Sequence, residues 1–126
     1  MKTAFIGAGH IASIHGTIIQ NMPDIDLVGI ADSDLSRAKS CAPRLSGCKY
    51  YQDAKKMIDE MKPDVIHVLT PPHLHFQSSI TAMNMGCHVL VEKPMALDGN
   101  EANKMIESSH KNKVSLCVNH NMVYES

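Results

Sequence analysis

The chain consists of short apolar runs that alternate with longer stretches of helical periodicity. The short runs are rich in β-branched residues, and apolar residues recur in the longer stretches at intervals of three and four. This pattern predicts strands that alternate with helices. The runs are almost continuously apolar, as expected when helices cover both faces of a parallel sheet. The predicted strands are Thr3–Gly7, Asp26–Ala31, a weak one at Lys49–Tyr51, Asp64–Thr70, His88–Glu92 and Val114–Asn119.

Three apolar stripes mark helices that we expect to bury one side against this sheet. Right-handed connections between the strands then give a doubly wound, mostly parallel α/β fold, for which we predict the strand order 3-2-1-4-5-6. The stripes are Ile11, Ile14, Ile18 and Met22 in the first helix, Phe76, Ile80 and Met83 in a later one, and Ala102, Met105 and Ile106 in a third.

A glycine turn joins the first predicted strand to the first predicted helix. It reads GAGHIA at residues 7–12, where Gly7 permits a tight turn, Gly9 lets the backbone approach a pyrophosphate and Ala12 allows close helix–strand packing. The N–H groups at the helix start, including those of His10 and Ile11, favour a bound phosphate. The turn therefore predicts a Rossmann fold that binds a dinucleotide. The alternative is a structural turn that binds no nucleotide.

The second predicted strand is followed by an acidic residue, Asp32. It lies about 20 residues beyond the glycine turn, where a carboxylate accepts hydrogen bonds from the adenosine ribose hydroxyls. A carboxylate there repels a 2′-phosphate, so we expect NAD rather than NADP. Ser33 and Arg37 are predicted to belong to the same cofactor site. Arg37 could still accommodate the 2′-phosphate of NADP. Alternatively, Asp32 caps the next helix, since Ser33 and Asp34 beside it are also good N-cap residues.

A proline-rich loop, TPPHLH at residues 70–75, follows the fourth predicted strand. Ligands bind outside the carboxyl ends of strands in open α/β sheets, and the prolines stiffen this loop and remove N–H donors. We therefore expect Thr70, Pro71, Pro72 and His75 to form a wall beside a nicotinamide and its ribose. The alternation of His73 and His75 also suggests a metal, but no third ligand lies nearby in the sequence, and we predict no metal site.

The tripeptide Glu92-Lys93-Pro94 lies at the end of the fifth predicted strand. Lys93 is expected on the same rim as the glycine turn, where a lysine can hydrogen-bond a reacting hydroxyl or carbonyl oxygen and shift its pKa. We therefore predict Lys93 as the catalytic residue and also as a cofactor contact, with Glu92 and Pro94 in the same cofactor site. If the tripeptide stood alone, a solvated lysine at a strand end would be the preferred interpretation.

These segments occur in one order: IGAGHIASIH, then AD at the second strand end, then VLTPPHLH, then GCHVLVEKP. The combination resembles the N-terminal domain of the Gfo/Idh/MocA oxidoreductases, and the resemblance spans nearly all of the 126 residues. The EKP tripeptide after a TP-x-x-x-H loop is its specific part, because a glycine turn alone indicates only a dinucleotide site.

The resemblance implies a role for each residue that matches a family motif. His15 matches a histidine often found one turn into the first helix, whereas Pro72 stands where the family commonly has Asn, which puts a polar contact there in doubt. The other matches are Gly7, Gly9 and Ala12 in the phosphate turn, Asp32 at the ribose, Thr70, Pro71 and His75 beside the nicotinamide, and Glu92, Lys93 and Pro94 near the hydride.

The resemblance also implies an activity, the transfer of a hydride between nicotinamide and a hydroxyl-bearing carbon of a sugar, polyol or related small molecule. Residues 1–120 would form the dinucleotide-binding domain, and residues 121–126 would begin the connection to a C-terminal substrate domain that this chain lacks. We therefore expect the parent enzyme to be a homo-oligomeric NAD(P)-dependent dehydrogenase. We expect this chain to be inactive by itself. The alternatives are a non-catalytic nucleotide-sensing or CoA-binding module and a reductase of the biliverdin or dihydrodipicolinate type.

Composition bears on the other possible partners. The net charge of −1, from 12 Lys and Arg against 13 Asp and Glu, offers no basic field for a nucleic acid backbone. No apolar run approaches the roughly 20 residues that cross a bilayer, and the chain begins with a strand rather than a signal segment. We expect a cytoplasmic protein with no membrane or nucleic acid partner. The four cysteines form no CxxC pair and are expected to be reduced.

Overall fold

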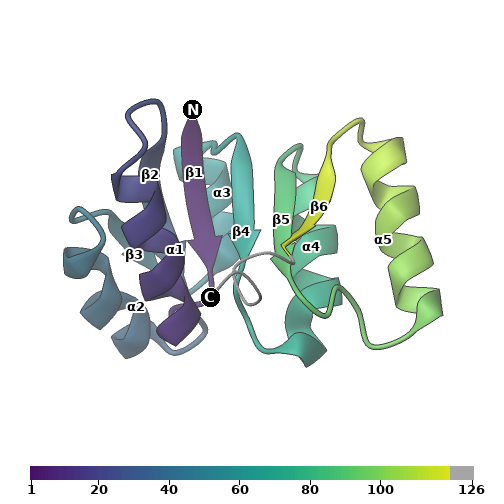
Figure 1. Cartoon of the computed structure of the whole chain (residues 1–126), viewed down its shortest axis with the longest axis horizontal. Helices are drawn as coiled ribbons and strands as arrows, with labels where there is room; N and C mark the ends of the chain where they lie inside the picture. Colours follow the sequence, from purple (N-terminus) through teal and green to yellow (C-terminus); the bar gives the residue numbers. More distant parts are fainter. Residues whose placement is uncertain (120–126) are drawn as a thin grey trace.

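The computed structural model describes residues 1–119, which form one parallel sheet of six strands with helices on both faces (Figure 1). The order β3-β2-β1-β4-β5-β6 confirms the predicted doubly wound fold. The predicted domain boundary at residue 120 and the connecting segment 121–126 lie outside the described residues. The elements are β1 Lys2–Ile6, α1 His10–Gln20, β2 Asp26–Ala31, α2 Leu35–Cys41, η1 Ala42–Arg44, β3 Lys49–Tyr51, α3 Ala54–Met61, β4 Val65–Val68, η2 Pro72–Leu74, α4 His75–Asn84, β5 His88–Glu92, α5 Gly99–Lys111 and β6 Leu116–Asn119.

Three strands differ from their predicted bounds. β1 is Lys2–Ile6 rather than Thr3–Gly7, because Gly7 has a φ of +109° and leaves the strand direction. β4 is Val65–Val68 rather than Asp64–Thr70, since the β1–β4 register ends at the Ile6–Val68 pair. β6 begins at Leu116 rather than Val114, because the Val114 N–H bonds back to the carbonyl of Ser109 at the end of α5.

The helices form two layers with separate apolar cores. α1 and α2 pack on one face, against side chains such as Phe5 and Ile30. α3, α4 and α5 pack on the other face, where Met57, Met83 and Met105 are fully buried. Within residues 1–119, no helix is long and apolar enough to cross a membrane.

The predicted buried stripe of α1 is confirmed only at Ile11, which is partly buried against the core, and is wrong for its other three residues. The buried residues of α1 are His15 and Ile19 together with the small residues Ala12 and Gly16. A Cβ on Gly16 would collide with the Leu45 side chain, so this glycine permits close packing on the segment after α2. The larger residues of the stripe are turned away, and Ile14, Ile18 and Met22 are 38, 42 and 44 % exposed.

The other two stripes differ in outcome. The α4 stripe is confirmed, because Met83 is buried and both Phe76 and Ile80 pack against the same core. In α5, Met105 is fully buried but Ile106 is 44 % exposed. Adjacent residues on a helix point about 100° apart, so the two cannot both face the core.

Two adjacent isoleucines of α1 provide a matched test of this packing. Ile19→Ala should lower the free energy of unfolding by about 2–5 kcal/mol, because it leaves a cavity in a packed core. Ile18→Ala removes the same atoms from an exposed position and should change stability by less than about 0.5 kcal/mol. Urea denaturation followed by circular dichroism measures both values. Equal losses for the two variants would contradict the orientation of α1.

Candidate cofactor site

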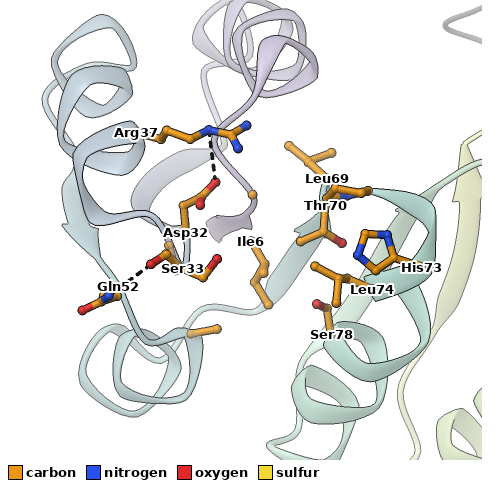
Figure 2. A pocket seen from close by; sticks show the side chains of 14 residues that line it. Ile6, Asp32, Ser33, Arg37, Gln52, Leu69, Thr70, His73, Leu74 and Ser78 are labelled. Carbon is orange, nitrogen blue, oxygen red and sulfur yellow. Dashed lines mark hydrogen bonds and ion pairs between the residues drawn. The ribbon is translucent and has the colours of Figure 1, made fainter.

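A cavity of about 310 Å³ lies at the carboxyl ends of β1, β2 and β4. Figure 2 shows Asp32, Ser33 and Arg37 on one side of it and Leu69, Thr70 and Leu74 on the other. The first side follows β2 and the second follows β4, the two strands that flank β1 in the sheet. The cavity therefore occupies the position where open α/β sheets bind ligands.

The glycine turn passes closely over the start of the Thr70 loop. Gly7 has a φ of +109°, and a Cβ built on it would lie 2.7 Å from the carbonyl carbon of Leu69 and 2.8 Å from the nitrogen of Thr70. Both the backbone conformation and this close contact require glycine at the position. The Gly7 N–H donates to the Ala31 carbonyl at 2.7 Å, which joins the turn to the end of β2.

The first turn of α1 differs from that of three other helices. Asp34, Asp53 and Asp98 cap α2, α3 and α5 through their carboxylates. α1 instead begins after Gly9 with no side-chain cap, a feature that it shares with α4 after Leu74. A Cβ on Gly9 would lie 3.0 Å from Arg37 Nη2, with no other atom of the described chain within 4 Å. The N-terminus of α1 can thus accept an anion without displacing a cap.

Asp32 is held between the glycine turn and α2. One of its oxygens accepts a hydrogen bond from the Ala8 N–H at 2.9 Å, and the other accepts from the Asp34 N–H at 2.8 Å. Arg37 Nε lies 3.9 Å from Oδ2. Asp34, not Asp32, is the N-cap of α2, since its carboxylate accepts from the Ser36 N–H. The carboxylate of Asp32 is therefore fixed at the cavity wall.

The Thr70 loop contributes a polar atom without a partner. Thr70 and Pro71 line the cavity, and the Thr70 hydroxyl is buried with no hydrogen-bond partner among residues 1–119. Pro72 is exposed and lies outside the cavity lining, whereas His73 belongs to the lining. His75 is buried behind the loop, with its ring nitrogens 2.6 Å from the Pro94 carbonyl oxygen and 2.8 Å from that of Thr70.

Glu92 and Lys93 point to different environments at the end of β5. Lys93 is exposed. It is not among the residues that line the cavity between Asp32 and Thr70. Glu92 is buried, and its Oε2 lies 2.6 Å from His15 Nε2 and accepts a hydrogen bond from Asn119 Nδ2 at 2.9 Å. Its carboxylate therefore joins β5 to α1 and β6.

A pair formed by buried His15 and partly buried His67 beside Glu92 was not predicted. His15 Nδ1 on α1 lies 2.8 Å from His67 Nδ1 on β4, and the Phe5 ring packs on the His67 ring at a tilt of 37°, with centroids 5.1 Å apart. Burial and, to a lesser extent, the charge of His15 lower the pKa of His67 to about 3. His67 is therefore neutral at pH 7. The sequence carries only a weak signal for it, a polar residue inside an otherwise apolar strand.

The structure brings together only part of the predicted site. The start of α1 holds Gly9, exposed His10, partly buried Ile11 and buried Ala12, next to but outside the cavity lining. Gln52 was missed; its amide donates to the Ser33 carbonyl at 3.1 Å from the segment after β3. Among residues 1–119, no three His, Cys, Asp or Glu side chains are grouped so as to hold a metal ion. The predicted residues in the lining are Gly7, Asp32, Ser33, Arg37, Thr70 and Pro71.

The sequence profile of an oxidoreductase family with an NAD-binding Rossmann fold, Gfo/Idh/MocA, matches residues 1–120. The match covers almost the whole chain. The chain belongs to this family and corresponds to its NAD-binding domain, which confirms the resemblance drawn from the order of the motifs.

Several similar proteins are named as dehydrogenases. The chain is 33 % identical over 112 residues to D-glucoside 3-dehydrogenase of Escherichia coli (strain K12), covering 88 % of this chain and 32 % of that protein. It is 30 % identical over 120 residues to UDP-N-acetylglucosamine 3-dehydrogenase of Acidithiobacillus ferrooxidans, covering 95 % of this chain and 37 % of that protein. The chain thus spans about a third of the length of these relatives.

Solved structures of similar proteins have the same fold. GenD2 from gentamicin A biosynthesis, in complex with NAD, aligns with a TM-score of 0.92 and 25 % identity, over 98 % of this chain and 35 % of that one. The WlbA dehydrogenase of Chromobacterium violaceum, in complex with NADH and UDP-GlcNAcA, aligns with a TM-score of 0.90 and 28 % identity, over 94 % and 34 %. Both structures contain a nicotinamide cofactor.

The lowered pKa of His67 predicts a pH dependence of stability. Its folded pKa of about 3 lies below the ordinary value of 6.5, so below pH 6.5 the unfolded chain binds a proton that the folded chain does not. Stability should therefore fall as the pH is lowered from 6.5 toward 3, with a slope approaching about 1.4 kcal/mol per pH unit from this group.

Urea denaturation between pH 7 and pH 5 tests this dependence. His67→Gln should be less stable than the wild type at pH 7, and the difference should shrink as the pH falls. His110→Gln changes an exposed histidine of α5 and should keep the wild-type slope. A His67→Gln profile that runs parallel to the wild-type profile would contradict the lowered pKa of His67.

Proposed function

We propose that this chain binds NAD as the cofactor domain of a longer dehydrogenase that oxidises or reduces a sugar or polyol. The observation that carries the proposal is the uncapped start of α1, which lies beside the fixed carboxylate of Asp32 at the carboxyl ends of the parallel strands. A dinucleotide needs an anion site and a ribose acceptor in such a neighbouring arrangement. Membership of a family with an NAD-binding domain supports the same conclusion.

The residues of the site fit the two ends of the cofactor. The backbone approach at Gly9, which among the described residues only the Arg37 side chain borders, and the N–H groups of His10 and Ile11 suit the diphosphate. Asp32 suits the adenosine ribose, with Ser33 and Arg37 beside it in the cavity wall. The unpartnered hydroxyl of Thr70 suits a polar group at the nicotinamide end. Pro71 extends that wall without adding an N–H donor.

Lys93 is our candidate for the residue that acts on the substrate. When bound, the nicotinamide supplies the carbon that gives or receives the hydride. The exposed position of Lys93 at the end of β5 allows its ammonium group to donate a hydrogen bond to the reacting oxygen, which stabilises negative charge there. The rest of the longer protein would supply the other wall of the substrate site and the proton acceptor. It would also supply the contacts of a homo-oligomer.

The substrate class rests on the relatives. Three relatives are named as 3-dehydrogenases, of a D-glucoside, of UDP-N-acetylglucosamine and of glucose-6-phosphate. Two others are named as inositol 2-dehydrogenases. These compounds share a ring carbon that bears a secondary hydroxyl. A sugar or polyol with such a carbon is therefore the substrate that we propose for the longer protein.

Gly9→Val tests the phosphate site. The branched side chain would occupy the backbone approach at the start of α1, so NADH affinity should fall at least about tenfold, or about 1.4 kcal/mol. NADH fluorescence measures the affinity without interference, because the chain contains no Trp. Gly99→Val makes the same change at the start of α5, where a Cβ meets no atom within 4 Å, and should bind normally. Unchanged NADH binding by a folded Gly9→Val variant would contradict the proposed phosphate site at the start of α1.

Asp32→Asn tests the choice between NAD and NADP. The wild type should bind NADH more tightly than NADPH, because the Asp32 carboxylate repels a 2′-phosphate. The variant loses this charge, and its preference for NADH should fall by about tenfold or more. Asp34→Asn changes the neighbouring N-cap, where Asn caps equally well, and should keep the wild-type ratio. Calorimetric titrations with both cofactors measure the ratios, and an equal wild-type affinity for both would contradict the role of Asp32.

A further inference from the structure

His75 makes two contacts that a neutral histidine cannot satisfy together. Its Nδ1 lies 2.6 Å from the carbonyl oxygen of Pro94, and its Nε2 lies 2.8 Å from the carbonyl oxygen of Thr70. A carbonyl oxygen only accepts hydrogen bonds, whereas a neutral imidazole carries a single N–H. The ring is 1 % exposed, so water cannot replace the missing donor. Both contacts are satisfied only when both nitrogens carry a proton.

The two carbonyl groups belong to different parts of the candidate site. Thr70 is the first residue of the loop at residues 70–75 and lines the cavity, and Pro94 follows Lys93 after the end of β5. His75 itself is the first residue of α4. The His75 side chain thus connects the Thr70 loop, the segment after β5 that contains Lys93 and Pro94, and the start of α4. Hydrogen bonds from a charged donor are shorter and stronger than neutral ones, which agrees with the 2.6 Å contact.

We propose that His75 is a positioning residue, a doubly protonated ring that fixes the Thr70 loop and the Lys93 turn relative to each other at the nicotinamide end of the site. This proposal rests on the proposed function. It also changes the sequence-based prediction that His75 contacts the cofactor, because the ring lies behind the loop and outside the cavity lining. Its effect on binding therefore passes through the backbone of Thr70 and Pro94.

The protonation of the ring can be measured directly on the wild-type chain. In a ¹⁵N-correlated NMR spectrum of histidine-labelled protein at pH 7, His75 should give two ring nitrogens that each carry a bonded proton. Loss of both signals in His75→Gln assigns them. One protonated and one bare nitrogen would overturn the double-donor arrangement. The number of protonated ring nitrogens is read from the wild-type chain, and the measurement needs no cofactor.

Two ligands separate positioning from general stability. NADH spans the whole proposed site, whereas ADP-ribose lacks the nicotinamide. The Gln amide of His75→Gln has a single donor nitrogen beside an accepting oxygen, so the variant should bind NADH about tenfold more weakly, or by about 1.4 kcal/mol, while its ADP-ribose affinity changes by less than about twofold. His110→Gln, at an exposed position of α5, should leave both affinities unchanged.

The outcomes of the titrations distinguish the two proposals. Equal losses for NADH and ADP-ribose in a folded His75→Gln variant, or no loss for either, would overturn the positioning role. If the wild-type chain binds neither ligand, the proposed function fails, and the NMR measurement still decides the protonation of His75.

Discussion

The turn at Gly7 is the constraint on which the rest of the site depends. The chain passes so close to the backbone of Leu69 and Thr70 that no Cβ fits, and its φ is positive. This crossing brings the start of α1 next to the end of β2, where the Gly7 N–H bonds to Ala31 and the Ala8 N–H to Asp32. The start of α1, an acidic side chain and the Thr70 loop thus meet at one edge of the sheet.

Buried histidines fix the surrounding segments. His15 connects α1 to β5 through the Glu92 carboxylate, and Asn119 extends this connection to β6. His75 connects the Thr70 loop to Pro94. Polar groups buried in this way specify one arrangement, because each loses a hydrogen bond if its partner moves. The loops at the cavity are therefore held by side chains from the sheet and from the helices behind them.

The sequence predicted the features that follow from local chemistry and topology. The glycine turn, the strand order and the position of Asp32 depend on residue types at fixed offsets. The buried face of α1 was mispredicted because Gly16 and Ala12 allow close packing that periodicity does not reveal. The pairing of His15 with His67 and Glu92, and the orientation of His75, depend on register and on side-chain direction across distant segments. No local pattern encodes those contacts.

Diffraction from crystals of this chain grown with NADH tests the central claim most directly. The account predicts density for the diphosphate within hydrogen-bond distance of the backbone N–H groups at the start of α1, with the adenosine ribose at Asp32 and the Arg37 side chain moved from Gly9. Crystals that contain the cofactor elsewhere, or that leave this position empty at saturating NADH, would contradict it.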